Sequence, residues 1–146
     1  MAIALAIFLF SLALNFLFRF LTPSFGAYRR GLDTVLYCSI ATGYVGGSDS
    51  GLLYGGLIAF SYYLFRSRQF DYAVFVIPLA ALTGAIAGMF SMQEFMTVGL
   101  GLFLFYHIIS ATVVMLYRYI ALQYLSFVGM NFITTFLLLR ITDLFV

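Results

Sequence analysis

Long apolar stretches separated by isolated charged residues constrain this chain more than any other feature of its sequence. Only seven basic and five acidic residues occur among 146, and 64% of the residues are hydrophobic. A soluble domain carries roughly 25% charged residues, whereas this chain carries 8%. Because a water-soluble fold could not hide so much apolar surface, the sequence predicts an all-α integral membrane protein.

Strands are the competing interpretation, because Phe, Tyr, Val and Ile are abundant and favour β structure in water. Outer-membrane barrels alternate apolar and polar residues along strands of ~10 residues. The stretches of this chain are apolar on every face. Helices are therefore expected throughout.

The spacing of charges and turn residues predicts the number of helices. A membrane span needs ~20 apolar residues, and the stretch 32–65 is about twice that length. The sequence GGSDSG at 46–51 interrupts this stretch with a turn composition. We expect one integral membrane domain, residues 1–146, forming a six-helix transmembrane bundle. The predicted helices are 2–21, 32–45, 52–65, 72–90, 95–117 and 119–139.

The arginines predict the orientation of the bundle, since cytoplasmic loops carry an excess of basic residues. With six crossings, the three arginine-bearing loops fall on one side, whereas the opposite loops carry Asp49 and Glu94. The predicted topology is N-out, C-out. The residues expected to set topology and to meet lipid headgroups are Arg29, Arg30, Arg66, Arg68 and Arg118.

The second and third predicted helices form an unusually short, Gly-rich helical hairpin. Each arm has roughly 14 residues and spans only ~21 Å, against a hydrocarbon core of ~30 Å. The arms therefore either lean on neighbouring helices in a thinned membrane or form a re-entrant hairpin with a protein-buried tip. Both alternatives return the chain to the cytoplasmic side.

Small residues recur at four-residue spacing in three segments. On a helix each set forms a smooth stripe, and such stripes let helix backbones approach closely. Packing within the chain is the first expectation, and a face for a partner chain is the alternative. The stripes are Ser39, Gly43 and Gly47; Gly51, Gly55 and Ala59; and Ala80, Gly84 and Gly88.

Five polar residues are the candidates for contact with a solute or ion. Ser48, Asp49 and Ser50 lie at the predicted hairpin tip, where a re-entrant loop would present them to a cation or polar solute. His107 and Asn131 lie near the middle of their predicted helices, where intramembrane polar groups are functional candidates. The alternatives are an ordinary exposed turn at the tip and simple interhelical hydrogen bonding by His107 and Asn131.

Motifs of catalysis and cofactor binding are absent from the sequence. It contains no G-x-S-x-G, no H-E-x-x-H and no phosphate-binding loop. A lone histidine is a poor zinc site, because zinc takes three or four ligands. The scattered basic residues form no nucleic-acid patch. We expect a non-enzymatic protein with no cofactor or metal and no nucleic-acid partner.

Two functions are compatible with these features. The first is a subunit of a larger membrane assembly, in which the lipid bilayer and other membrane chains, in a homo- or hetero-oligomer, are the partners. The second is a small transporter or channel that uses the 46–51 tip with His107 and Asn131.

The expected location is a bacterial or archaeal cytoplasmic membrane or an organelle inner membrane. In architecture the plan is similar to small substrate-binding subunits of energy-coupling-factor vitamin transporters and to the rod-shape-determining protein D, without any of their motifs.

Overall fold

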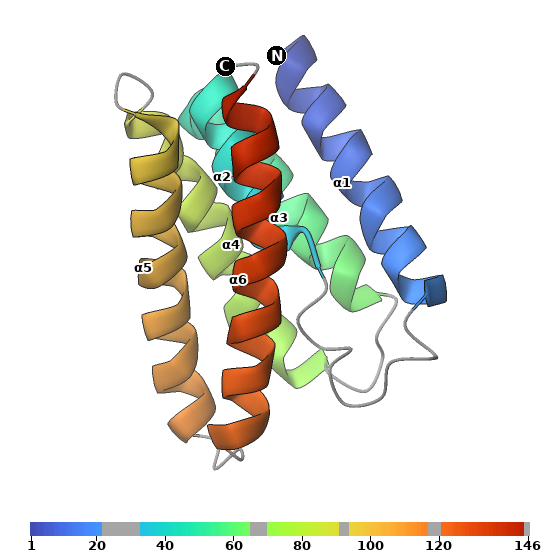
Figure 1. Cartoon of the computed structure of the whole chain (residues 1–146), viewed down its shortest axis with the longest axis vertical. Helices are drawn as coiled ribbons and strands as arrows, with labels where there is room; N and C mark the ends of the chain where they lie inside the picture. Colours follow the sequence, from blue (N-terminus) through green and yellow to red (C-terminus); the bar gives the residue numbers. More distant parts are fainter. Residues whose placement is uncertain (22–32, 65–69, 91–93, 117–120, 145–146) are drawn as a thin grey trace.

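The elements of the chain are α-helices. The computed structural model describes residues 1–21, 33–64, 70–90, 94–116 and 121–144, and within them it contains six helices and no strand. The predicted all-α fold with six helices is confirmed for this part of the chain. The beginning of α1 and the end of α6 lie at the same end of the bundle (Figure 1). The helices are α1 (Ala2–Leu21), α2 (Val35–Gly46), α3 (Ser48–Leu64), α4 (Phe70–Met89), α5 (Phe95–Leu116) and α6 (Ala121–Asp143).

The shortest helix, α2, lies at the centre of the bundle. It contacts all five other helices, and every residue from Val35 to Gly43 is buried. Its 12 residues extend for about 18 Å, and α2 occupies the half of the bundle nearest the two termini (Figure 1). The helix therefore begins inside the bundle and not at its surface.

The junction of α2 and α3 differs from the predicted turn at 46–51. Only Gly47 separates the two helices, and it has φ +84°, a left-handed conformation that glycine adopts without steric cost. Residues 48–51 already belong to α3, which has 17 residues and is longer than predicted. The short-hairpin prediction thus holds for α2 alone, because one glycine reverses the chain where a six-residue loop was expected.

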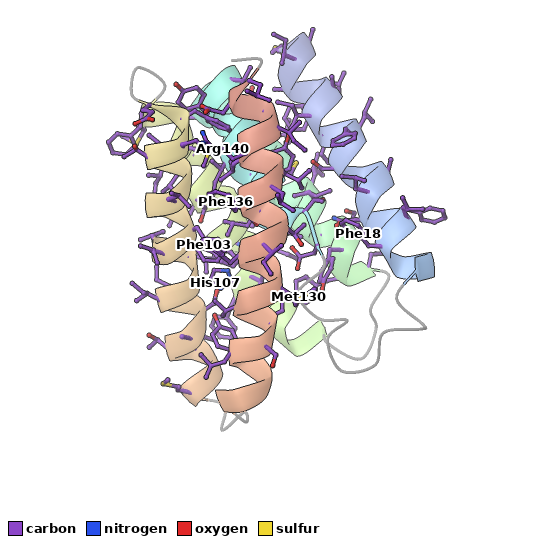
Figure 2. The ribbon with its side chains drawn as sticks, viewed as in Figure 1. Phe18, Phe103, His107, Met130, Phe136 and Arg140 are labelled. Atoms are coloured by element: carbon purple, nitrogen blue, oxygen red, sulfur yellow. The ribbon has the colours of Figure 1, made fainter. Side chains whose placement is uncertain are left out.

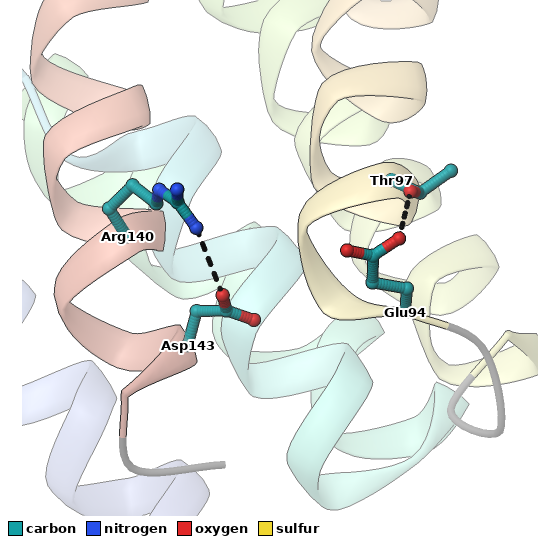
Figure 3. A network of polar contacts seen from close by, with 4 residues as sticks. All are labelled: Glu94, Thr97, Arg140 and Asp143. Carbon is teal, nitrogen blue, oxygen red and sulfur yellow. Dashed lines mark hydrogen bonds and ion pairs between the residues drawn. The ribbon is translucent and has the colours of Figure 1, made fainter.

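The last helix continues beyond the predicted end at 139 to Asp143. The Thr142 hydroxyl donates to the Leu138 carbonyl oxygen at 2.9 Å and lies 2.7 Å from the Tyr37 hydroxyl on α2. Arg140 and Asp143 form an exposed ion pair at 3.5 Å in the final turn, close to the beginning of α5 (Figure 3). Contact with α2 explains why the helix does not stop at the first charged residue.

Apolar side chains cover the outside of the bundle and also fill most of its interior. On α6, the side chains of Leu125, Ile133 and Leu137 are exposed, whereas Asn131 and Thr135 are buried. By length and apolar composition, two helical segments of the described residues are able to cross a membrane, 95–113 in α5 and 124–143 in α6. Large exposed apolar surfaces are typical of helices in contact with lipid or with other protein chains.

Candidate functional site

The candidate site begins where α2 starts inside the bundle. Asp33 and Thr34 precede the helix, and both are buried. The Thr34 N–H donates to Asn15 Oδ1 of α1 at 2.8 Å, and Thr34 Oγ1 donates to the Ser11 carbonyl oxygen at 2.9 Å. Asp33 Oδ1 accepts the N–H of Val35 at 3.1 Å. At an exposed helix start, water can accept hydrogen bonds from the first backbone N–H groups. At the buried start of α2, side chains of the protein accept them.

A chain of hydrogen bonds joins Asp33 to α6 and then to α5. Asn131 Nδ2 donates to Asp33 Oδ1 at 3.2 Å, and Asn131 Oδ1 lies 3.2 Å from His107 Nε2. Thr135 Oγ1 donates to the same amide oxygen at 3.4 Å. Asp33 is 4% exposed, Asn131 2% and His107 6%. A carboxyl group, an amide and an imidazole are therefore connected in the interior, where His107 lies between α5 and α6 (Figure 2).

The second ring nitrogen of His107 extends the chain to Tyr124. Its Nδ1 lies 3.3 Å from the Tyr124 hydroxyl, which donates to the His107 carbonyl oxygen at 3.1 Å. Aromatic rings surround the imidazole: Phe103, Tyr106 and Phe127 have centroids 4.3, 5.3 and 5.9 Å from it. The imidazole therefore has a polar neighbour at each nitrogen and aromatic rings against its other surfaces.

Further buried polar atoms lie at the two ends of this chain. Within the described residues, Asn15 Nδ2 beside Thr34 makes no hydrogen bond, whereas Ser11 Oγ interacts with the Cys38 thiol and Ser110 Oγ with the Tyr124 hydroxyl. Buried polar groups normally have a partner in the protein or in ordered water. These atoms therefore supply hydrogen-bonding groups for a small polar species at either end of the network.

The arrangement combines three groups that exchange protons. A carboxyl, an imidazole and a phenol are connected in order, with an amide between the first two. Within the described ranges, no three His, Cys, Asp or Glu side chains gather as a metal site. The geometry therefore suits proton transfer and hydrogen bonding to a solute.

The polar residues predicted as one site lie in two separate places. Ser48, Asp49 and Ser50 form the first turn of α3, where Asp49 is exposed. Within the described ranges, the backbone of α3 packs on α1, α2 and α4, and no Cα atom of α3 lies within 8 Å of a Cα atom of α5 or α6. Because α2 lies between them, the α2–α3 junction does not meet His107 or Asn131. Of the five candidates, the structure brings only these last two together.

The small-residue stripes face one another among α2, α3 and α4. A Cβ added at Gly51 would lie 2.6 Å from the Gly43 Cα and would overlap the Gly84 carbonyl group. A Cβ at Gly55 would lie 2.7 Å from the Ala80 carbonyl oxygen. Apart from Gly47 and Gly88, which are partly buried, every member of the three stripes is buried. Ser39 lies against Gly55, Ala59 is fully buried, and Gly88 packs on Gly47 and Ser48.

The arginines expected to set the topology lie outside the described residues. These are Arg29, Arg30, Arg66, Arg68 and Arg118. Their contact with lipid headgroups stays a prediction. Among the described residues, Glu94 at the start of α5 accepts a hydrogen bond from Thr97 at 2.8 Å near the Arg140 ion pair (Figure 3).

Asp33 is the functional candidate that sequence reasoning missed. The predicted helix 32–45 places Asp33 at a helix end, and the structure also places it there, two residues before α2 begins. That end, however, is in the bundle interior, level with the middles of α1 and α6, where its neighbours Ser11, Asn15 and Asn131 lie. The signal that could have found it is the length of α2, since a helix too short to cross a bilayer must begin or end inside it.

No family model, curated protein or solved structure matches this chain. The geometry around Asp33, Asn131 and His107 is therefore the basis for a function.

Proposed function

We propose that this protein is a six-pass membrane protein that moves protons, alone or with a small polar solute, by protonation and deprotonation of Asp33 and His107, the two ionisable groups that Asn131 joins. The observation that carries the proposal is the hydrogen-bonded chain from Asp33 through Asn131 to His107. Ionisable groups inside a membrane are costly and mark ion pathways and proton relays. A helix that begins at the same depth is typical of transporter binding sites.

The surface of the bundle supports insertion in a membrane. Soluble monomers rarely expose apolar patches larger than a few hundred Å², yet large apolar side chains are exposed along all the helices except α2. The 20 residues of α1 and of α4 extend for about 30 Å, which equals the thickness of the hydrocarbon core. The beginning of α1 and the end of α6 lie at the same end of the bundle (Figure 1), as an even number of crossings requires. The proposed N-out, C-out topology has an even number of crossings.

Transport is better supported than a docking role within an assembly. The small-residue stripes were the main reason to expect a face for a partner chain. Gly43, Gly51 and Gly84 instead pack against one another inside this chain. The stripes therefore leave no smooth outer face on α2, α3 or α4, whereas the polar network has no comparable packing role.

Burial of the network argues that it has been retained for more than stability. A buried polar group costs free energy unless it is hydrogen-bonded, and a buried charge costs more. Apolar residues at the same positions would pack these helices without that cost. Asn15 Nδ2, which has no hydrogen-bond partner within the described residues, increases this cost further.

Proton flux into proteoliposomes tests the proposal. Vesicles that contain the purified protein and a trapped pH-sensitive dye are given a potassium diffusion potential with valinomycin. Wild-type protein should acidify the vesicles faster than empty vesicles, whereas Asp33→Asn and His107→Gln should lose most of this flux. The matched control is Asp49→Asn, the same substitution at an exposed carboxyl outside the network.

Each outcome of this experiment bears on the proposal. Loss of flux in both network variants, with Asp49→Asn unchanged, supports proton movement that uses Asp33 and His107. Wild-type flux no faster than that of empty vesicles, with and without a panel of small polar solutes, would overturn it. Equal flux in wild type, Asp33→Asn and His107→Gln would show that protons do not use these residues.

A further inference from the structure

Asn131 lies between the two ionisable groups of the network and contacts each with a different end of its amide. An amide oxygen only accepts hydrogen bonds, and an amide nitrogen only donates them. Oδ1 faces His107 Nε2 at 3.2 Å and Thr135 Oγ1 at 3.4 Å, while Nδ2 faces Asp33 Oδ1 at 3.2 Å. The direction of this one amide therefore affects both neighbours.

The contacts of Asp33 and Thr135 determine which way the amide points. An ionised carboxylate only accepts hydrogen bonds, and Asp33 Oδ1 receives the N–H of Val35 as well as Asn131 Nδ2. Thr135 donates its hydroxyl proton to the opposite end of the amide. Reversal would place the amide oxygen against the carboxylate oxygen, so the observed direction is the one that an ionised Asp33 requires.

This direction determines where His107 holds its proton. Because Nε2 faces an oxygen that only accepts, Nε2 must carry hydrogen. In the neutral ring Nδ1 is then bare. The Tyr124 hydroxyl has one proton, which it can donate either to Nδ1, 3.3 Å away, or to the His107 carbonyl oxygen, 3.1 Å away. When Nδ1 gains a proton, the hydroxyl can turn to the carbonyl and accept the new N–H.

We propose that Asn131 is a positioning residue that keeps hydrogen on His107 Nε2 and leaves Nδ1 as the nitrogen that gains and loses protons. A proton reaches Nδ1 from the Tyr124 side, forms the imidazolium and leaves from the same nitrogen. It does not pass through Asn131, because the amide would have to exchange its donor and acceptor ends.

The position of hydrogen on the His107 ring does not depend on the proposed function. Only the use of His107 in transport rests on that function. In that setting, His107 and Asp33 are two proton sites on opposite sides of an amide that separates them. Protons on His107 exchange toward Tyr124 and Ser110, on the side of the ring away from Asn131. The position of hydrogen on the ring is a property of the folded protein and is measured without any flux.

Nitrogen-15 NMR of the imidazole tests the proposal, because the chain contains a single histidine. Protein labelled at the histidine ring nitrogens is reconstituted in lipid and measured at a pH where the ring is neutral. In wild type, Nε2 should give the signal of a protonated nitrogen and Nδ1 that of a bare one. In Asn131→Leu, which removes the acceptor, hydrogen should move to Nδ1, next to the Tyr124 hydroxyl.

A second variant separates the two ends of the amide. Asn131→Asp keeps an oxygen acceptor for Nε2 and replaces the amide donor to Asp33 by a proton that the two neighbouring carboxyl groups share, so hydrogen should stay on Nε2. A neutral wild-type ring with hydrogen on Nδ1 would overturn the proposal, even if Asn131→Leu does not fold. Retention of hydrogen on Nε2 in a folded Asn131→Leu protein would also overturn it, because Asn131 would then have no positioning effect.

Failure of this inference is distinguishable from failure of the proposed function. If vesicle flux depends on Asp33 and His107 but the neutral ring carries hydrogen on Nδ1, transport stands and the positioning role of Asn131 is wrong. If the ring behaves as expected but no flux is found, Asn131 positions the imidazole in a network that does not transport protons.

Discussion

Replacement of Gly51 by alanine tests the close packing at the centre of the bundle. The added Cβ would overlap the carbonyl group of Gly84 and lie 2.6 Å from the Cα of Gly43. All three nearest atoms belong to the backbone, so no side-chain rotation can relieve the overlap. The helices α3 and α4 must therefore move apart, and the contacts of α2 with both are weakened.

The magnitude follows from two opposing effects. Alanine in place of glycine stabilises a helix by roughly 0.5–1 kcal/mol. Overpacking a well-packed core costs about 1–3 kcal/mol, occasionally more, and backbone overlap places Gly51→Ala at or above the upper end. The net loss should be about 2–3 kcal/mol. At roughly 2–4 °C per kcal/mol for a chain of this size, the unfolding midpoint should fall by about 5–10 °C.

The single cysteine provides the assay. Cys38 lies in α2, is fully buried, and is the only cysteine of the chain, so a thiol-reactive fluorogenic dye labels it as the bundle opens on heating. The control is Gly101→Ala on α5, where an added Cβ would have no neighbour within 4 Å. This control should leave the midpoint unchanged or raise it, because only the helix propensity changes.

Comparison of the two variants decides the outcome. Equal midpoints for Gly51→Ala and Gly101→Ala would refute the inference that backbone contact at Gly51 holds α3 against α4. Immediate labelling of Cys38 in the unheated wild-type protein would refute the central, buried position of α2.

Three further substitutions probe the contacts around α2 and the end of α6. Asn15→Leu removes the acceptor of the Thr34 N–H and should lower stability by about 1–2 kcal/mol, as for loss of a helix cap, measured as a lower midpoint of Cys-dye labelling. Tyr37→Phe removes the hydroxyl contact with Thr142 and should cost about 0.5–1.5 kcal/mol in the same assay, with an unchanged midpoint as the contrary result. Arg140→Gln breaks an exposed ion pair and should change stability by no more than about 1 kcal/mol; a larger fall would mean that this pair has a structural role.

The helices and their interior stripes could be predicted because both are encoded locally. Some 20 consecutive apolar residues satisfy their own backbone hydrogen bonds in lipid, so each such stretch becomes a helix whatever its neighbours are. The four-residue spacing of Gly51, Gly55 and Ala59 likewise follows from the turn of a single helix. Residues near one another in sequence are sufficient for both predictions.

Local patterns were insufficient at the junction of α2 and α3. GGSDSG has the composition of a turn, yet Ser48, Asp49 and Ser50 are helical. Glycine, serine and aspartate also suit the first turn of a helix. The choice between loop and helix depended on Gly47, whose positive φ allows a one-residue reversal, and on the packing of Gly88 against Gly47 and Ser48.

The candidate site depended on contacts that no local pattern contains. His107 and Asn131 could be selected from the sequence because each is a polar residue in the middle of an apolar helix. Asp33 could not, since a carboxyl at a helix end is ordinary unless that end is buried. Its partner Asn131 is 98 residues away in the sequence. Only the packing of a short α2 inside five longer helices places its first residues at the depth of His107, because burial of α2 on all sides leaves its start in the interior.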